Sequence, residues 1–192
     1  MPLTALANIN GQEKLIDITA YNKPKSAFAA VQFFCPECKC PMHIRHTLAL
    51  KPHFAHNPRS KTSVEHLACS LNNESPDHRD AKIRIRDFLK SHELYSDCKF
   101  QFEYDIAGVR RADLVAIFPD GTIESHEIQL SGISAITLAQ RTSDYESRGI
   151  SVFWWLGEKA NKDDIKHWLY GHCGQFGSIR TATTFDSIDP KK

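Results

Sequence analysis

The fold of this chain is decided by residues 110–131, RRADLVAIFPDGTIESHEIQLS. An apolar run, Leu114 to Phe118, is followed by Pro119-Asp120-Gly121 and by a second run from about Thr122 to Leu130. Proline presets φ and glycine accepts a positive φ, so the residues between the two runs predict a tight turn. The stretch therefore predicts a β-hairpin centred on Asp120.

The hairpin brings acidic side chains together. With the turn at Asp120, Asp113 lies opposite Glu127, and directly opposed side chains on antiparallel strands are about 5 Å apart. Gln129 projects from the same face as Glu127 because it lies two residues further along the strand. Two carboxylates this close repel each other, and a hard cation relieves that repulsion. The residues therefore predict a site for a divalent metal, Mg²⁺ or Mn²⁺.

The order Asp, hairpin, Glu-x-Gln resembles the active site of PD-(D/E)XK nucleases, with Gln129 at a position where that pattern more often has Lys. The wider context, R-x-A-D … E-I-Q-x-S … R-T-S-D-Y … G-I-S-V-F-W-W, resembles the nuclease domain of the competence protein CoiA family, whose members carry Glu-x-Gln. The resemblance implies a metal-dependent nuclease that hydrolyses DNA phosphodiester bonds in DNA processing, uptake or recombination. The metal would be held by Asp113, Glu127 and the backbone carbonyl of Ile128.

Gln129 keeps other functions open. A Gln amide can orient water or donate a neutral hydrogen bond, but it cannot accept a proton at neutral pH. Activity would then depend more on a second metal, on Arg111 or on His78. The alternatives are a DNA-binding or assembly module that kept the fold and lost catalysis, and a nuclease that acts in defence against foreign DNA. DNA and RNA, single and double strands, and endo and exo cleavage all stay open.

The apolar pattern predicts a mixed α/β domain over residues 73–192. The order of helices and strands predicted for this domain is that of the PD-(D/E)XK core, a mixed sheet flanked by helices. Residues 1–72 are expected to form an N-terminal β segment, with candidate strands at 14–19 and 27–34, and a small zinc-binding module. The elements predicted for the second domain are a helix from Ser75 to about His92, strands at 98–106, 110–118 and 122–130, a helix at 134–147, a strand at 150–156 and a helix at about 161–170.

A cluster of Cys and His residues predicts the zinc site. The C-x₂-C turn supplies two ligands from one loop, and a structural zinc needs four in a tetrahedron. His53 could replace either downstream ligand, and Cys40 could compete with Cys38. CoiA-like proteins carry a similar C-P-x-C … H-F-x-H segment, so the resemblance also favours zinc. The predicted ligands are Cys35, Cys38, His56 and Cys69.

The first predicted helix carries three further candidates. Glu74, His78 and Lys82 are spaced four residues apart, so they share one face once helical. The resemblance implies that an acidic residue here faces the metal, which makes Glu74 a candidate catalytic residue. His78 could contact phosphate or shuttle a proton, whereas Lys82 is expected to be a solvated charge.

Other candidates flank the carboxylate pair. Glu103 lies on the strand predicted before the hairpin. It is either a third carboxylate of the metal site or an exposed charge on that strand. Arg111 shares a face with Asp113 and could pair with it or touch the scissile phosphate. Arg141 and Tyr145 lie four residues apart on one helix face, and the resemblance implies a DNA-contacting or site-supporting role for both.

Composition sets the remaining expectations. The formal net charge of the 192 residues is +1, so no global field draws the chain to DNA, but basic residues gather within 35–64. No apolar run approaches the roughly 20 residues that span a bilayer, and no secretory signal is evident. Six Cys residues in a chain expected to be cytoplasmic favour metal binding over disulfides. The expected partners are DNA and DNA-processing proteins, with no membrane.

Overall fold

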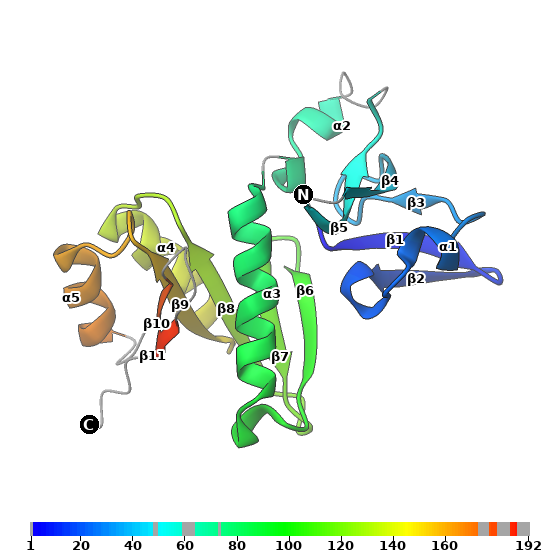
Figure 1. Cartoon of the computed structure of the whole chain (residues 1–192). Coiled ribbons are helices and arrows are strands. Elements are labelled where there is room, and N and C mark those ends of the chain that lie inside the picture. Colours follow the sequence, from blue (N-terminus) through cyan, green and yellow to red (C-terminus); the bar gives the residue numbers. More distant parts are fainter. Residues whose placement is uncertain are drawn as a thin grey trace. The chain divides into compact units, whose positions relative to one another are not determined.

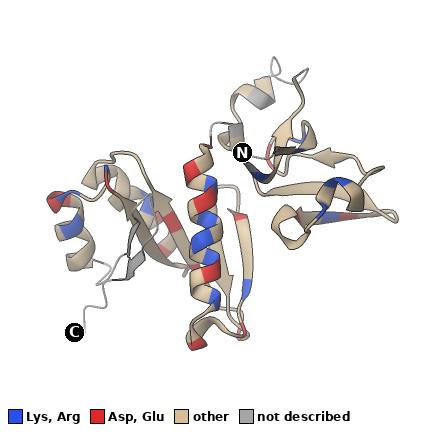
Figure 2. Cartoon of the chain, viewed as in Figure 1, with Lys and Arg blue, Asp and Glu red and all other residues tan. Residues whose placement is uncertain are grey.

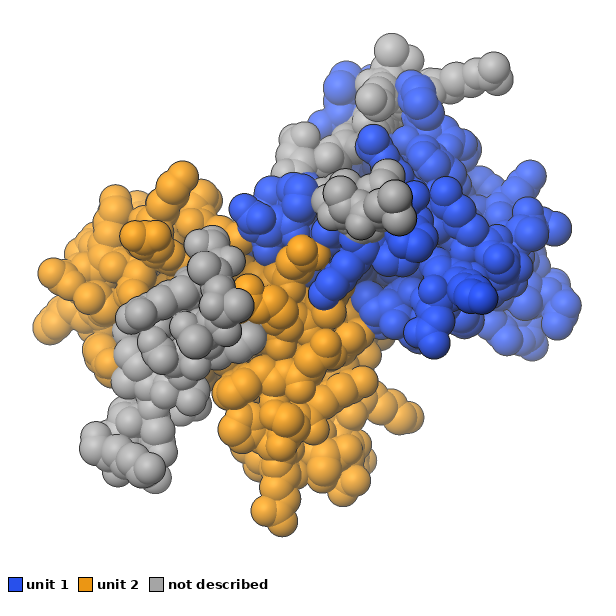
Figure 3. All heavy atoms as spheres, in the orientation of Figure 1, with its two compact units in different colours: residues 1–79 blue, residues 80–192 orange. Residues whose placement is uncertain are grey.

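The computed structural model describes residues 2–47, 50–58, 64–72, 74–172, 177–179 and 185–187. The chain divides into two compact units, Met1–Arg79 and Asp80–Lys192, coloured separately in Figure 3. The boundary between residues 72 and 73 stays a prediction. Arg59 and Lys61 of the basic segment lie outside the described residues.

Unit 1 contains a five-stranded antiparallel sheet in the order β2-β1-β3-β4-β5 (Figure 1). Buried side chains from several of these strands, including Ala5, Ile16, Phe33 and Phe54, form its apolar interior. Its elements are β1 (Thr4–Ile9), β2 (Gln12–Asp17), α1 (Pro24–Ala27), β3 (Phe33–Phe34), β4 (Pro41–Thr47), β5 (Leu50–His56) and α2 (Val64–Leu67).

Two expectations for unit 1 were wrong in detail. The predicted strand at 27–34 is reduced to Phe33–Phe34, because Pro24 begins a short helix and the Phe28 ring packs against Tyr21 and Phe33. The candidate strands at 14–19 and 27–34 also leave out the hairpin β4–β5, which the structure contains. Its strands are rich in His, Arg, Lys and Pro, so their apolar alternation is weak in the sequence.

Unit 2 contains a six-stranded mixed sheet in the order β11-β10-β9-β8-β7-β6 (Figure 1). β8, β9 and β10 are parallel neighbours, and the other pairs are antiparallel. The mixed α/β fold is as predicted. Its strands are β6 (Lys99–Ile106), β7 (Arg110–Ile117), β8 (Ile123–Gln129), β9 (Ser151–Gly157), β10 (Gly177–Ile179) and β11 (Phe185–Ser187). Its helices are α3 (Pro76–Lys90), which begins in unit 1, α4 (Ala135–Glu146) and α5 (Asp163–His172).

Local sequence explains where these elements begin and end. Gly121 has φ of 89° in the predicted turn, and Thr122 N–H donates to Asp120 Oδ1 at 2.9 Å. Ser75 Oγ accepts the N–H of His78 at 3.2 Å and so caps the start of α3, close to the predicted beginning of that helix. Gly149, with φ of 68°, follows the end of α4. The predicted helix and strand boundaries in this part of the chain agree with the structure to within about two residues.

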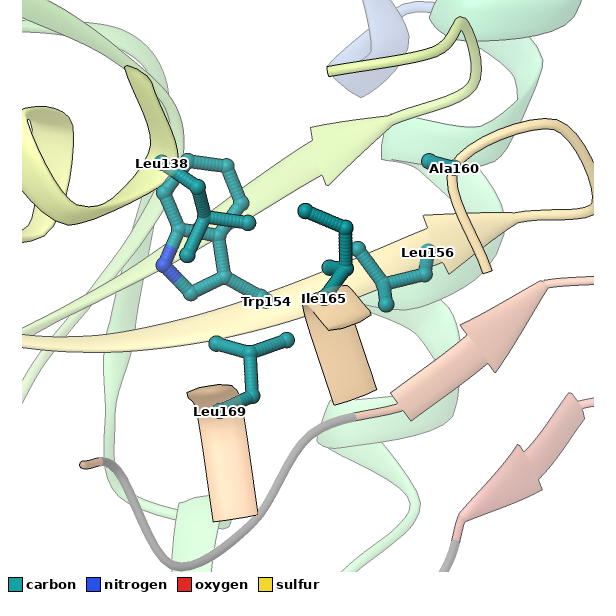
Figure 4. Close-up of a cluster of buried hydrophobic side chains, with 6 residues drawn as sticks. All are labelled: Leu138, Trp154, Leu156, Ala160, Ile165 and Leu169. Atoms are coloured by element: carbon teal, nitrogen blue, oxygen red, sulfur yellow. The ribbon is translucent and has the colours of Figure 1, made fainter. Parts of the chain in front are cut away.

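Helices contact both faces of the unit 2 sheet. On one face, Phe88 of α3 packs against Trp155 at 5.9 Å between ring centroids. On the other, α4 and α5 pack on β9, with Leu138, Trp154 and Leu169 fully buried (Figure 4). Both tryptophans are core residues. Figure 2 shows that α3 carries both acidic and basic residues along its length.

Candidate active site and metal centre

Asp113 and Glu127 lie together where the β7–β8 ladder ends. The pairing between the two strands stops at Leu114 and His126, which is the register predicted from the turn. Beyond that pair, carboxylate oxygens accept the backbone hydrogen bonds that join the two strands. Asp113 N–H donates to Glu127 Oε1 at 3.1 Å, and Ile128 N–H donates to Asp113 Oδ2 at 3.0 Å. The two predicted metal ligands are therefore neighbours, each held by the other's strand.

Glu127 accepts hydrogen bonds from several neighbouring groups. Tyr145 donates its hydroxyl hydrogen to Oε1 at 2.6 Å, and Arg141 donates to Oε2. Ser125 Oγ lies 3.4 Å from the same Oε1. The side chain of Glu127 is only 1% exposed, whereas that of Arg141 is 22% exposed. A buried carboxylate is thus linked through Arg141 to the surface.

Burial, reinforced by the neighbouring Asp113, raises the pKa of Glu127. Arg141, Tyr145 and the Asp113 amide oppose this rise without cancelling it. Burial and the nearby Glu127 also raise the pKa of Tyr145, so its hydroxyl remains a donor. A carboxylate with a raised pKa beside a second carboxylate is an electrostatic setting that a cation would relieve.

Gln129 contacts Arg141 and Ser131. Its Oε1 accepts a 3.0 Å hydrogen bond from Arg141 Nη1. Its Nε2 donates to the backbone oxygen of Ser131 at 2.9 Å and to Ser131 Oγ at 3.0 Å. The structure therefore brings together five residues singled out in the sequence: Asp113, Glu127, Gln129, Arg141 and Tyr145.

The burial of Lys82 shows that the prediction for this residue was wrong. It was expected to be a solvated charge, but its side chain is 1% exposed and its Nζ lies 2.9 Å from Glu103 Oε1. Glu103 is likewise buried, which excludes the reading as an exposed strand charge. Its φ of 56° is unusual for a residue inside a strand and interrupts the alternation used for the prediction. Lys82 is thus a buried, paired residue that helical spacing alone did not reveal.

Arg111, Glu74 and His78 make other contacts. Arg111 Nη1 donates to the backbone oxygen of Glu103 at 2.9 Å, which ties β7 to β6 near the carboxylates. Glu74 Oε1 lies 2.9 Å from His78 Nδ1, as their spacing on one helix face predicted. Both belong to unit 1, so their predicted roles at the carboxylate site stay predictions.

The carboxylate oxygens of Asp113 and Glu127 are of the type that binds divalent cations. Carboxylate oxygens are the preferred protein ligands of Mg²⁺. In this structure Arg141 supplies the positive charge on Glu127 Oε2, so a cation would have to share or displace that contact. The backbone of Ile128 contributes its N–H to Asp113 here, and the role of its carbonyl stays a prediction.

A second centre lies in unit 1. Within the described residues, one group of three or more metal-ligating side chains gathers around a common point, with ligand atoms within 4.8 Å of one another. Cys35 Sγ lies 3.7 Å from Cys69 Sγ, and His56 Nε2 lies 3.2 Å from Cys38 Sγ and 3.9 Å from Cys69 Sγ. The group is the predicted set, Cys35, Cys38, His56 and Cys69.

These distances fit a tetrahedral metal. Metal–sulfur bonds of about 2.3 Å in a tetrahedron place sulfur atoms about 3.8 Å apart. Contact with Cys69 and burial raise the pKa of Cys35 to about 12, and burial raises the pKa of Cys38 to about 11. The thiols would ionise at neutral pH only with a cation among them. The cluster can therefore hold a metal such as zinc.

His53 and Glu37 lie between these ligands in the sequence. His53 is fully buried, and its Nδ1 lies 3.0 Å from the backbone oxygen of Lys51 and 3.2 Å from Arg79 Nη1. It is not in the ligand group, so the alternative ligand set with His53 is not the one formed. Glu37, inside the C-x₂-C turn, accepts bonds from Ser70 N and Oγ at 2.7 and 2.5 Å. That contact joins the loop to the segment carrying Cys69.

Two family profiles match the chain. The profile described as Competence protein CoiA, nuclease-like domain, matches residues 74–179. The chain belongs to the CoiA family. The profile of the CoiA N-terminal domain matches residues 20–65, which contain three of the four cluster residues. No curated protein and no solved structure matches the chain.

The family assignment agrees with the distribution of the two centres. The carboxylates lie within the match to the CoiA nuclease-like domain, and most of the Cys/His cluster lies within the match to the CoiA N-terminal domain. No helix in the described part of the chain is long and apolar enough to cross a membrane.

Proposed function

We propose that this CoiA-family protein is a divalent-metal-dependent deoxyribonuclease. The observation that carries the proposal is the buried carboxylate of Glu127, whose pKa is raised beside Asp113 and whose Oε2 contacts the partly exposed Arg141. Paired carboxylates next to an accessible guanidinium suit a site that binds a cation and a phosphate. The substrate would be DNA in processing, uptake or recombination.

Each residue has a part in this proposal. Tyr145 and the Asp113 amide hold Glu127 in one orientation, while the Ile128 amide holds Asp113. A divalent cation bound there, Mg²⁺ or Mn²⁺, would polarise the phosphate and activate a water for attack. Arg141 would neutralise charge on the phosphate as the bond to the leaving oxygen breaks. Arg111 would support the site through its bond to β6.

The Cys/His cluster would bind zinc for a structural purpose. All four ligand positions come from the protein, so no position is open for a substrate. The metal would join the C-x₂-C loop, β5 and the segment around Cys69, in the same way as the contact between Glu37 and Ser70. We expect the protein to act in the cytoplasm, together with other DNA-processing proteins.

One observation favours a second function, a DNA-binding or assembly module without catalysis. Arg141 binds both Glu127 and Gln129, so the buried carboxylate of Glu127 already has a positive partner within the chain. Such a site could be stable without a cation and present basic groups to DNA. The two proposed functions differ in one property, the cleavage of DNA.

The experiment is cleavage of single- and double-stranded DNA by the zinc-loaded protein with Mg²⁺ or Mn²⁺. Glu127→Gln and Asp113→Asn keep the size of the side chains, and Glu158→Gln changes an exposed carboxylate elsewhere as the matched control. We expect metal-dependent cleavage by the native protein and the control, and a loss of at least about 100-fold in the site variants. Binding without cleavage by a folded native protein would favour the second function, and cleavage that persists in both site variants would place the active site elsewhere.

A further inference from the structure

The amide of Gln129 has only one orientation that its neighbours allow. The backbone oxygen of Ser131 accepts hydrogen bonds and cannot donate, so the group facing it is the NH₂ of Gln129. The carbonyl oxygen of the amide then faces Arg141 Nη1 at 3.0 Å. Gln129 therefore acts as an acceptor toward Arg141, with its own donors occupied by Ser131.

Arg141 is held from several sides. Nη2 donates to Glu127 Oε2 while Nη1 donates to Gln129 Oε1. Its Cζ lies 4.7 Å from the ring centroid of the buried Trp154, so the guanidinium also lies against an aromatic surface. Trp154 is fixed in turn by the bond from its Nε1 to Thr142 Oγ1 at 3.0 Å. A side chain that is 22% exposed is thus set in a defined place at the edge of the carboxylate site.

We propose that Gln129 is a positioning residue for Arg141 and that Arg141 is the group that meets the substrate phosphate. The inference rests on the proposed nuclease function. Gln129 would not act on water or on a cation itself. Its carbonyl oxygen would aim the guanidinium, and Ser131 would fix the amide that does so.

A neutral acceptor suits position 129 on electrostatic grounds. A lysine there would place an ammonium against Arg141 and could offer it no hydrogen-bond acceptor. A glutamate would add a third negative charge beside Glu127 and Asp113 and would bind the guanidinium more tightly. Glutamine holds the guanidinium through one neutral bond, so it adds no negative charge that would compete with a phosphate.

The test is a double-mutant cycle between Gln129→Met and Arg141→Met. Methionine matches glutamine in length, puts a shorter unbranched apolar chain in place of arginine, and removes the polar groups of both. Gln129→Met alone should lower kcat by about 10- to 100-fold, with little change in KM for DNA, because misplacing a charged group costs most in the transition state. In the Arg141→Met background the same change should alter kcat by less than about twofold, since a residue acting only through Arg141 has nothing left to position.

Further variants separate this role from a direct one. Gln129→Lys should be at least as impaired as Gln129→Met, and Gln101→Met on β6 serves as a control for the loss of a glutamine amide. Losses that multiply in the double variant would overturn the inference, because Gln129 would then act independently of Arg141. Activity of Gln129→Lys equal to the native level would overturn it as well.

A readout that needs no cleavage completes the experiment. In the native protein the side-chain N–H signals of Arg141 should be resolved by NMR, and they should broaden or vanish in Gln129→Met but remain in Gln101→Met. If the native protein cuts DNA and these signals do not change, positioning is wrong while the nuclease function stands. If the signals change but no protein cuts DNA, the positioning is supported and the nuclease function has failed.

Discussion

The hydroxyl of Tyr145 donates a 2.6 Å hydrogen bond to Glu127 Oε1, so helix α4 holds the central carboxylate of strand β8. Arg141, one turn earlier on the same helix, binds the other oxygen of that carboxylate. Their spacing of four residues places both side chains on one face. The pair α4–β8 is thus joined at the point where a cation is proposed to bind.

Removing that hydroxyl should affect both stability and pH dependence. Tyr145→Phe leaves Glu127 buried with one donor fewer, which should lower the free energy of unfolding by about 1–3 kcal/mol in chemical denaturation. The lost bond favoured the ionised carboxylate, so the pKa of Glu127 should rise further and the acid limb of cleavage should move to higher pH. Tyr21→Phe, at a tyrosine that is 38% exposed, is the matched control. An unchanged acid limb would show that Glu127 does not control the reaction.

Glu127 itself should make metal-free stability depend on pH. Its pKa in the folded protein is raised above the ordinary value of 4.5, so the folded state binds the proton more tightly than the unfolded state. The free energy of unfolding should therefore decrease as pH rises from about 4.5 to the folded pKa, and affinity for Mn²⁺ should increase over the same interval.

Glu127→Gln tests that linkage. It mimics the protonated form, so it should lose this part of the pH dependence and be at least as stable as the native protein at pH 7 when no metal is bound. Urea denaturation from pH 4 to 8 measures both proteins. A variant that keeps the native slope would assign the pH dependence to other groups.

The buried pair Lys82–Glu103 should be costly to break from one side. Lys82→Met leaves Glu103 buried without this partner, which should lower the free energy of unfolding by about 3–5 kcal/mol. The double variant Lys82→Met/Glu103→Gln should recover most of the loss, because no uncompensated charge is left. Lys159→Met, at an exposed lysine, should be neutral. A double variant no better than the single one would mean that the pair contributes more than mutual neutralisation.

The two histidines near the cysteines should differ in their effect on metal content. His56→Gln should lose bound zinc, measured by elemental analysis of the purified protein, because its Nε2 lies within the ligand group. His53→Gln should keep zinc, although it changes the imidazole that contacts Arg79. Chelation of the native protein should lower its thermal stability, since structural zinc contributes directly to folding. Zinc retained by His56→Gln would refute the ligand set.

Local sequence was enough to predict the hairpin and its register. Pro119, Asp120 and Gly121 act through their own backbone preferences, so the turn and the opposition of Asp113 to Glu127 follow from residues adjacent in the chain. The caps of α3 and α4 were equally local, because Ser75 and Ser134 bond to residues three positions ahead.

Other features depended on contacts that sequence spacing does not encode. Helical spacing put Lys82 on a face with His78, but only packing against β6 supplied Glu103 as its partner. The positive φ of Glu103 lies outside the preferences of glutamate and had no signal in the chain. Among the Cys and His residues, the sequence allowed more than one ligand set, and the folded chain selected His56 over His53.

The sequence by itself therefore determined the order of elements from α3 to α5, the turn and the types of residue available for a cation, because each arises from short-range backbone preference or from side-chain chemistry. The tertiary structure alone decided which of those residues meet. It placed Arg141 between Glu127 and Gln129, and it buried Lys82 with Glu103. The physical reason is that charge pairing and desolvation depend on three-dimensional distance. The sequence around a residue does not show which distant residue will lie against it.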